Sequence, residues 1–320
     1  MDQADLANFA AMAKASSPLI SLIVCTYNRE KFLGDCLDSI LEQVLSQDQY
    51  EVIVVNNNST DATPTILENF KVKAPTNWAF FLEEQQGLSY ARNRGMQEAV
   101  GEYLTYVDDD AILPADFLQR QHDQLVRQPE LAGLGGKILA KFEGPKPDWF
   151  NPYTAPTYFS HYDRGTKSYI YREGDFPFGC NMCIRKSLIQ DVGGFDTDLG
   201  RIGKGGLGGE EKKLFGQIIR AGGKVLYLPD LWVHHQVDHY RTERPYVEKI
   251  SRGLGVSHRL LYCGPESSSW SCLRARMKMH LKLGAAYLLH VKYLLQGNKA
   301  VGPHLIQFRK WALEGFRSSD

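Results

Sequence analysis

The most informative part of the chain is the stretch Tyr103-Leu-Thr-Tyr-Val-Asp108-Asp109-Asp110, an apolar segment that ends in three carboxylates. Its composition predicts a buried strand that delivers acids to a cleft. Clustered carboxylates raise each other's pKa unless a cation or a ring of donors satisfies them. The stretch therefore indicates a metal site, and a solvated acidic turn is the alternative interpretation.

Apolar strands and amphipathic helices alternate around this stretch. We predict strands at residues 19–24, 51–55, 78–82, 103–107, 179–184 and 224–228. We predict helices at residues 31–44, 89–99, 114–127 and 210–221, and a short helix that begins at Thr63. Alternating strands and helices favour a mostly parallel central sheet flanked by helices. The polar residues that follow its strands should then line one crevice at the carboxyl edge.

Two irregular segments interrupt this pattern. Residues 142–178 are rich in proline, glycine and aromatic residues. Their rings are either exposed platforms for sugar rings or apolar acceptor groups, or they pack the loop onto the domain. Residues 200–209 are rich in glycine, and we interpret them as a lid or hinge. Glu210 and Glu211 follow directly and open a helix, where acids also serve as caps.

The net charge of zero hides an asymmetry between the two parts of the chain. Residues 1–240 carry 23 basic and 32 acidic side chains, whereas residues 241–320 carry 14 and 5. In the basic part, Met277, Leu281, Leu288 and Leu295 recur at helical spacing. This pattern predicts either peripheral contact with an anionic membrane or packing on the catalytic domain or a second subunit. No nucleic-acid-binding motif accompanies the charge, so we expect no nucleic-acid partner.

The six cysteines are scattered, which suggests reduced thiols in a cytosolic protein. Residues 1–17 lack the basic start and long apolar core of a signal peptide, so we interpret them as a frayed leader. The apolar stretch at residues 283–291 is too short to span a bilayer. We therefore expect a cytoplasmic protein, with peripheral attachment to the inner face of the cell membrane as an option.

An ordered series of motifs resembles the family 2 glycosyltransferases, bacterial-type nucleotide-sugar-dependent enzymes with a GT-A fold. The series is Val24-Cys-Thr-Tyr-Asn28, Val54-Val-Asn-Asn-Asn-Ser-Thr-Asp61, Gly87-Leu-Ser-Tyr-Ala-Arg-Asn93, Asp108-Asp-Asp110, Gly193-Gly-Phe-Asp196, Gly209-Glu-Glu211 and Tyr227-Leu-Pro229 to His235. The resemblance implies a GT-A catalytic domain at residues 18–241, followed by a basic helical extension at 242–320.

The resemblance also implies an Asp-X-Asp metal site. Asp110 is the first candidate ligand, with Asp108 and His235 beside it. Oxygen ligands favour Mg²⁺ or Mn²⁺, and an added imidazole favours Mn²⁺. His234 should point away from the site, because neighbouring residues of an extended segment face opposite sides.

Similar enzymes place a catalytic base where this chain has Glu210 and Glu211, and alignment favours Glu211. We expect the nucleotide to be bound by Thr26, Tyr27, Asn28, Arg29, Asn56, Asp61, Arg92, Asn93, Asp108 and Asp109. Asn56 stands where similar enzymes have an aspartate that accepts a hydrogen bond from the uracil ring. The amide oxygen of an asparagine can accept the same hydrogen bond, so UDP is the favoured nucleotide. Arg92 would either stack on the nucleobase or bind a phosphate group of the nucleotide. The alternative interpretation is a solvated arginine on the surface of a helix.

The implied activity is an inverting hexosyl transfer to a hydroxyl of a saccharide or lipid-linked acceptor, in the synthesis of a surface polysaccharide or glycoconjugate. Two alternatives stay open. A sugar-nucleotide nucleotidyltransferase would have a glycine-rich basic loop after the first strand, which residues 25–29 lack. A catalytically silent nucleotide-sugar-binding module would not need the acidic motifs.

Overall fold

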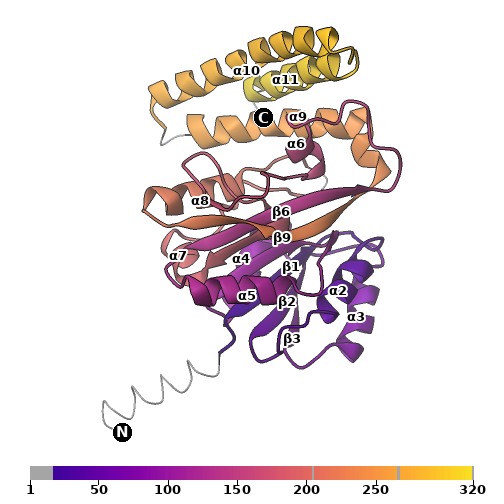
Figure 1. The fold of residues 1–320 in the computed structure, drawn as a ribbon, viewed down its shortest axis with the longest axis vertical. Helices are drawn as coiled ribbons and strands as arrows, with labels where there is room; N and C mark the ends of the chain where they lie inside the picture. Colours follow the sequence, from indigo (N-terminus) through magenta and orange to yellow (C-terminus); the bar gives the residue numbers. More distant parts are fainter. Residues whose placement is uncertain (1–16, 204, 265–266, 319–320) are drawn as a thin grey trace.

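The computed structural model describes residues 17–203, 205–264 and 267–318 and shows a mixed sheet beneath three long C-terminal helices (Figure 1). Apart from Ser17, the predicted leader lies outside the described residues. Within the described ranges, no helix is long and apolar enough to cross a membrane.

The first half of the sheet is parallel, as predicted. Its strands are β1 (Ile20–Thr26), β2 (Tyr50–Asn56), β3 (Trp78–Leu82) and β4 (Tyr103–Asp108), in the order β3-β2-β1-β4. The connecting helices are α2 (Leu33–Leu41), α3 (Thr63–Lys73) and α4 (Leu88–Glu98). Cys25 of β1 pairs with Val55 on one side and Asp108 on the other, so these strands end level with one another. This register brings their polar extensions to one edge.

The second half of the sheet contains the antiparallel pairs. It consists of β5 (Ala111–Ile112), β6 (Gly133–Phe142), β7 (Tyr169–Ile170), β8 (Met182–Arg185) and β9 (Val225–Val237). Strand β8 runs antiparallel to both β4 and β6, whereas β6 and β9 are parallel. Helices α5 (Phe117–Arg127), α7 (Lys186–Asp191) and α8 (Glu210–Arg220) belong to this half. Together with the first half, this architecture confirms the predicted α/β fold.

Two differences from the predicted strands have local causes. Strand β6 was not predicted because glycines interrupt its apolar pattern. In the structure, a Cβ on Gly136 would lie 1.7 Å from the carbonyl oxygen of Leu231. The two strands therefore approach each other too closely for a side chain at this position. Strand β9 (Val225–Val237) extends well beyond the strand predicted at 224–228. Its pairing shifts opposite Gly136 and Lys137, and this irregularity accommodates Pro229.

The aromatic excursion packs onto the C-terminal helices with its first part and onto the sheet with its second part, instead of facing solvent. It contains α6 (Ala155–Phe159), and the 3₁₀ turn η1 (Gly179–Asn181) follows it in place of the start of the strand predicted at 179–184. Trp149, Tyr158 and Phe159 are buried in a second core, whereas Tyr153 is 47% exposed. The interpretation of exposed sugar platforms is therefore wrong for most of these rings, because they supply the apolar surface that holds the loop in place.

The C-terminal extension is helical, as predicted. After the turn η2 (His239–Thr242) come α9 (Arg244–Cys263), α10 (Ser269–Leu295) and α11 (Val301–Arg317), stacked at one end of the molecule (Figure 1). Helix α9 contributes Tyr246, Val247 and Ile250 to the second core, and α11 contributes Phe308 and Trp311.

The expectation of six reduced cysteines is wrong for two of them. Cys263 and Cys272 form a disulfide, because the short connection between α9 and α10 brings them together. The other four cysteines are free thiols, and Cys36, Cys180 and Cys183 are buried.

Candidate active site

A cavity of about 620 Å³ opens at the carboxyl ends of β1 and β4. Its walls come from the loop after β1, the acidic run, the glycine-rich loop, the start of α8 and helix α9. The predicted site residues on these walls are Thr26, Tyr27, Asn28, Arg29, Arg92, Asp108, Asp109, Glu210 and Glu211. The volume is in the usual range for small-molecule sites.

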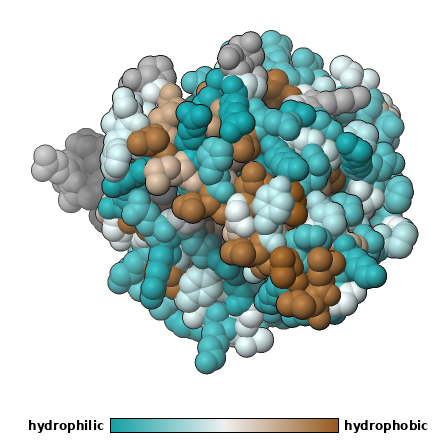
Figure 2. Space-filling view, turned by 90° about the horizontal axis from the view of Figure 1, so that it is seen from above, coloured by the Kyte–Doolittle hydropathy of each residue, from teal (hydrophilic) through white to brown (hydrophobic). Residues whose placement is uncertain are grey.

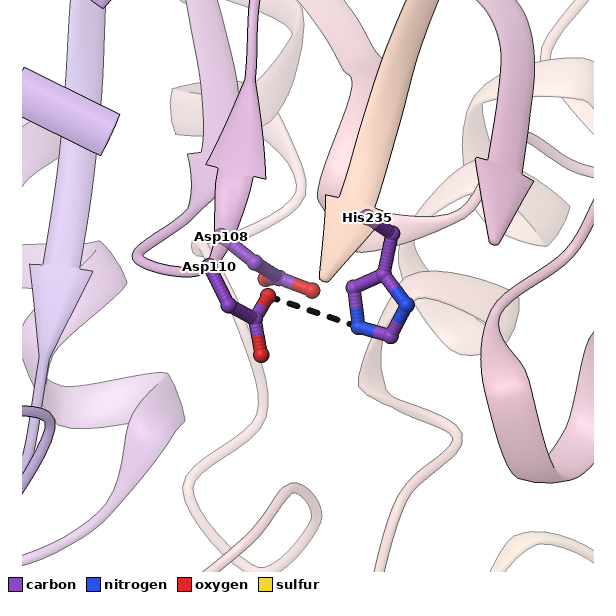
Figure 3. Close-up of side chains that lie close together, drawn as sticks. All are labelled: Asp108, Asp110 and His235. Atoms are coloured by element: carbon purple, nitrogen blue, oxygen red, sulfur yellow. Dashed lines mark ion pairs between the residues drawn. The ribbon is translucent and has the colours of Figure 1, made fainter. Parts of the chain in front are cut away.

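Three candidate metal ligands meet beside this cavity. Asp108, Asp110 and His235 each offer one ligand atom, and these atoms all lie within 4.8 Å of one another (Figure 3). The pairing of β5 with β9 brings Asp110 close to His235, because Ala111, the residue after Asp110, lies opposite His235. The distance between Asp110 Oδ1 and His235 Nε2 is 3.4 Å.

His235 has the protonation state that a metal ligand needs. Arg241 Nη1 lies 3.0 Å from His235 Nε2, and because a guanidinium can only donate, Nε2 carries the lone pair. Burial lowers the pKa of His235 to about 4, which keeps the imidazole neutral. His234 lies elsewhere, with its ring edge-on to Trp232, so the two histidines diverge as expected.

Asp110 is buried among cations. Its Oδ2 accepts a hydrogen bond from Arg241 at 2.8 Å and lies 3.4 Å from Arg29 Nη2. Burial would raise the pKa of Asp110, but the surrounding positive charge holds it below the usual range. Its Oδ1 accepts no hydrogen bond from any described residue. This free carboxylate oxygen beside an imidazole lone pair fits a divalent cation, although Arg241 contacts two of the same side chains.

The other two acids of the run differ in their surroundings. Asp109 is buried and accepts a hydrogen bond from Arg29 Nε at 2.9 Å. The Asp108 side chain is 34% exposed and lies 3.9 Å from Arg92 Nη2. Burial, followed by the charge of Asp110, raises the pKa of Asp108 to about 6. Asp108 is thus the ligand candidate that is most open to the cavity.

The acidic pair at the start of α8 is held by Arg92. Its Nη1 lies 2.9 Å from Glu210 Oε1 and 3.2 Å from Glu211 Oε1. The Glu210 side chain is 4% exposed and that of Glu211 is 17% exposed. Burial, together with the charge of Glu211, raises the pKa of Glu210 to about 8. Arg92 is therefore not a solvated helix arginine, since its side chain is 3% exposed and both acids and the Phe195 ring contact it.

Three predicted nucleotide-binding residues do not line the cavity. Asn56 Oδ1 accepts from the Ser59 amide at 3.0 Å. Asp61 accepts from the amides of Glu30 and Thr63 and so caps the start of α3. Asn93 exchanges two hydrogen bonds of 2.8 Å with the backbone of Phe195.

Other cavity residues were missed by the sequence analysis. Asn57 lies on the wall, and its Oδ1 accepts from the Gly87 amide at 2.8 Å. Arg241 and residues of α9 such as Tyr246 also line the cavity, although the motif series ends before them. Arg241 follows His235 by six positions, and this closeness to a candidate ligand was the signal available in the sequence.

Residues 21–193 match the family described as "Glycosyl transferase family 2". Over 249 residues the chain is 25% identical to the glucosyl-dolichyl phosphate glucuronosyltransferase of Haloferax volcanii, covering 76% of this chain and 77% of that protein. It is 27% identical to the succinoglycan biosynthesis protein ExoM of Rhizobium meliloti over 247 residues, covering 76% of this chain and 75% of that protein.

Solved structures of glycosyltransferases share the fold. The mannosyltransferase PcManGT from Pyrobaculum calidifontis, in complex with GDP-Man and Mn²⁺, superposes with a TM-score of 0.63 at 19% identity, covering 95% of this chain and 88% of that chain. TarS of S. aureus, residues 1–349 in complex with UDP-GlcNAc, gives a TM-score of 0.56 at 18% identity, covering 93% and 89%. The fold of this chain is therefore GT-A-like, as expected.

Proposed function

Because the chain belongs to glycosyl transferase family 2, we propose that it is an inverting, metal-dependent enzyme that transfers a sugar from a nucleotide diphosphate to a hydroxyl group. One observation carries the proposal. A single cavity is lined by Glu211 and by Asp108, and Asp108 belongs to the cluster with Asp110 and His235. A donor diphosphate and an acceptor hydroxyl can thus be bound side by side.

Asp110, Asp108 and His235 would hold the cation. A bound Mn²⁺ or Mg²⁺ would supply charge neutralisation for the diphosphate leaving group, which typically contributes several kcal/mol. Two carboxylates and a neutral imidazole favour Mn²⁺. Arg29 lines the same part of the cavity, and its ion pair with Asp109 fixes its orientation.

Glu211 would take the proton of the acceptor hydroxyl. Its carboxylate is more exposed than that of Glu210, and Arg92 orients it by a contact of 3.2 Å. A positioned carboxylate base contributes about 10²- to 10⁴-fold to a rate. With one base and no second carboxylate in the role of nucleophile, direct displacement would invert the anomeric carbon.

UDP is the favoured nucleotide of the donor, on the strength of the motif series, and the solved relatives hold UDP-GlcNAc or GDP-Man. The acceptor would be a saccharide or a lipid-linked saccharide in surface polysaccharide or glycoconjugate synthesis. Two relatives support this class of acceptor, because one is a glucosyl-dolichyl phosphate glucuronosyltransferase and the other a succinoglycan biosynthesis protein. We place the reaction in the cytoplasm.

A thermal-shift panel with UDP, GDP, dTDP and CMP, each with and without Mn²⁺, tests the donor site. A ligand at 100 times its Kd adds about 2.7 kcal/mol to the free energy of unfolding. We expect a manganese-dependent shift with UDP that Asp110→Ala abolishes and Asp116→Ala, a change in an exposed ion pair, leaves intact. No shift with any nucleotide in the presence of metal would overturn the proposal.

Incubation of the nucleotide sugar with candidate acceptors separates the rival functions. Release of the nucleoside diphosphate marks a transferase. Synthesis of a sugar nucleotide from a nucleoside triphosphate and a sugar phosphate would indicate a nucleotidyltransferase instead. Binding of the donor without any turnover would indicate a silent module.

A further inference from the structure

Helix α10 has two apolar faces. On one face, Ala275, Met279 and Ala286 are buried against α11. The opposite face carries an exposed apolar stripe whose members are three, four or seven positions apart. The stripe consists of Trp270, Leu273, Met277, Leu281, Leu288, Val291 and Leu295.

The stripe is well exposed. Leu288 is 75% and Leu295 85% accessible, which is unusual for leucines in a helix that already buries its other face. Figure 2 looks onto this end of the molecule and shows hydrophobic side chains gathered among hydrophilic ones. A contiguous apolar surface of this kind marks a contact with a protein or a membrane.

The sequence segment that contains the stripe carries only positive charge. Residues 267–313 contain eight lysines and arginines and no aspartate or glutamate. On α10 itself the cations are Arg274, Arg276, Lys278, Lys282 and Lys292. At 100° per residue, Arg274, Lys278 and Lys292 fall along one border of the stripe and Arg276 along the other.

We propose that α10 docks flat on an anionic phospholipid bilayer. The stripe would enter the boundary between headgroups and acyl chains, and the bordering cations would contact the anionic headgroups. Trp270 at the start of the helix suits this position, because tryptophan favours the interface between water and lipid. This docking is a property separate from the proposed catalysis and does not depend on it.

The charge pattern argues against a second copy as the occupant of the stripe. Helices that pair through such a stripe usually place opposite charges along its borders. Two copies of α10 would instead bring two sets of four bordering cations together, and this helix has no acidic residue to offset them. An anionic lipid surface neutralises the same cations, so it is the complementary partner.

Flotation with vesicles tests the docking without any need for turnover. We expect the full chain to float with vesicles of phosphatidylcholine that contain phosphatidylglycerol, and not with phosphatidylcholine alone. High salt should release it, because salt screens the surface potential. Trp270 provides a local reporter, because it is 58% exposed whereas the other four tryptophans are buried or partly buried. Its emission should shift to shorter wavelength on anionic vesicles, and Trp270→Phe should remove that shift.

Matched variants locate the contact. Leu281→Glu with Leu288→Glu should weaken vesicle partition at least tenfold, whereas Val72→Glu, at a 90% exposed position of α3, should leave it unchanged. Arg274→Gln with Lys292→Gln should weaken it roughly 25-fold, since each cation near an anionic surface contributes about fivefold. Unchanged thermal unfolding shows that these exposed changes keep the fold.

Three outcomes would overturn the proposal. The first is equal flotation with neutral and anionic vesicles, and the second is flotation that survives the stripe variant. The third is a dimer in sedimentation that the change Leu281→Glu dissociates, which would assign the stripe to a second copy of the chain.

Discussion

At the residue scale, Glu211 and Glu210 share one arginine but differ in exposure, and this difference favours Glu211 as the proposed base. We expect Glu211→Gln to bind the nucleotide normally and to lose about 10²- to 10⁴-fold in transfer rate. Glu210→Gln is the control and should keep most of the activity, because its side chain is only 4% exposed. Titration of nucleotide binding and single-turnover transfer measure both effects. Normal turnover by Glu211→Gln would contradict the assignment.

The raised pKa of Glu210 predicts a pH dependence of stability. Its folded value of about 8 exceeds the ordinary 4.5, so its contribution to stability is full below pH 4.5 and is lost as the pH rises through 8. Glu210→Gln cannot ionise and escapes this loss. Relative to wild type, the variant should therefore gain on the order of 3 kcal/mol between pH 5 and pH 8. Urea unfolding at both pH values measures the difference in unfolding free energy between the variant and the wild type. A difference that does not change between pH 5 and pH 8 would contradict the prediction.

Arg241 and a bound cation would compete for the same two side chains, Asp110 and His235. It contacts Asp110 Oδ2 and His235 Nε2, so Arg241→Ala should lower the metal-free unfolding free energy by about 3 kcal/mol. The stabilisation by Mn²⁺ should then be larger than in wild type, because a freed carboxylate is available. Thermal unfolding with and without Mn²⁺ measures both effects, with Arg120→Ala in an exposed ion pair as the control. A smaller manganese effect would mean that Arg241 helps to shape the site.

At the element scale, Asn93 joins helix α4 to the turn before Asp196. Its amide both donates to and accepts from the Phe195 backbone. Asn93→Ala should therefore cost about 1 to 3 kcal/mol of stability and leave nucleotide affinity unchanged. Chemical unfolding and a nucleotide titration separate the two quantities. Loss of affinity at unchanged stability would restore the nucleotide-binding role that the motif series implies.

The same elements show what the sequence could predict. Strand β3 is found at residues 78–82 as predicted, and α4 begins one residue earlier than expected, because periodic apolar patterns report burial directly. Strand β6 was not predicted because its glycines allow two strands to approach each other closely, and a local sequence pattern does not indicate such an approach. The predicted strand at 224–228 stopped before Pro229, which is unfavourable inside a sheet, and the irregular pairing that tolerates this proline in β9 is a tertiary feature.

Some residues of the candidate site could likewise be predicted from the sequence, and others could not. Asp110 and His235 could be predicted because each follows or occupies a recognisable strand. The α9 wall could not, since it comes from a segment without family motifs and meets the site only through packing, and the one signal for Arg241 was its closeness in sequence to His235. The binding role of Asp61 stays a prediction, because its carboxylate accepts from the Glu30 and Thr63 amides and is not among the residues that line the cavity.

At the scale of the whole molecule, the cavity lies between two apolar cores. The larger core is centred on β1, β2 and β4, whereas the second joins the aromatic excursion to α9 and α11. Tyr246 and Ile250 of α9 line the cavity and also belong to the second core. Helix α9 is thus part of the cavity wall, whereas α10 carries the proposed membrane surface.

This arrangement predicts that the catalytic segment is incomplete without its extension. A chain shortened to residues 1–241 keeps the sheet but loses the α9 wall and exposes Trp149 and Phe159 of the second core. Each buried aromatic that loses its packing costs several kcal/mol. We expect circular dichroism to show retained sheet structure, while nucleotide affinity falls at least tenfold and the protein associates through the exposed core. A shortened chain that binds the nucleotide as tightly as the full chain would show that the sheet loops alone form the donor site, with α9 reserved for the acceptor.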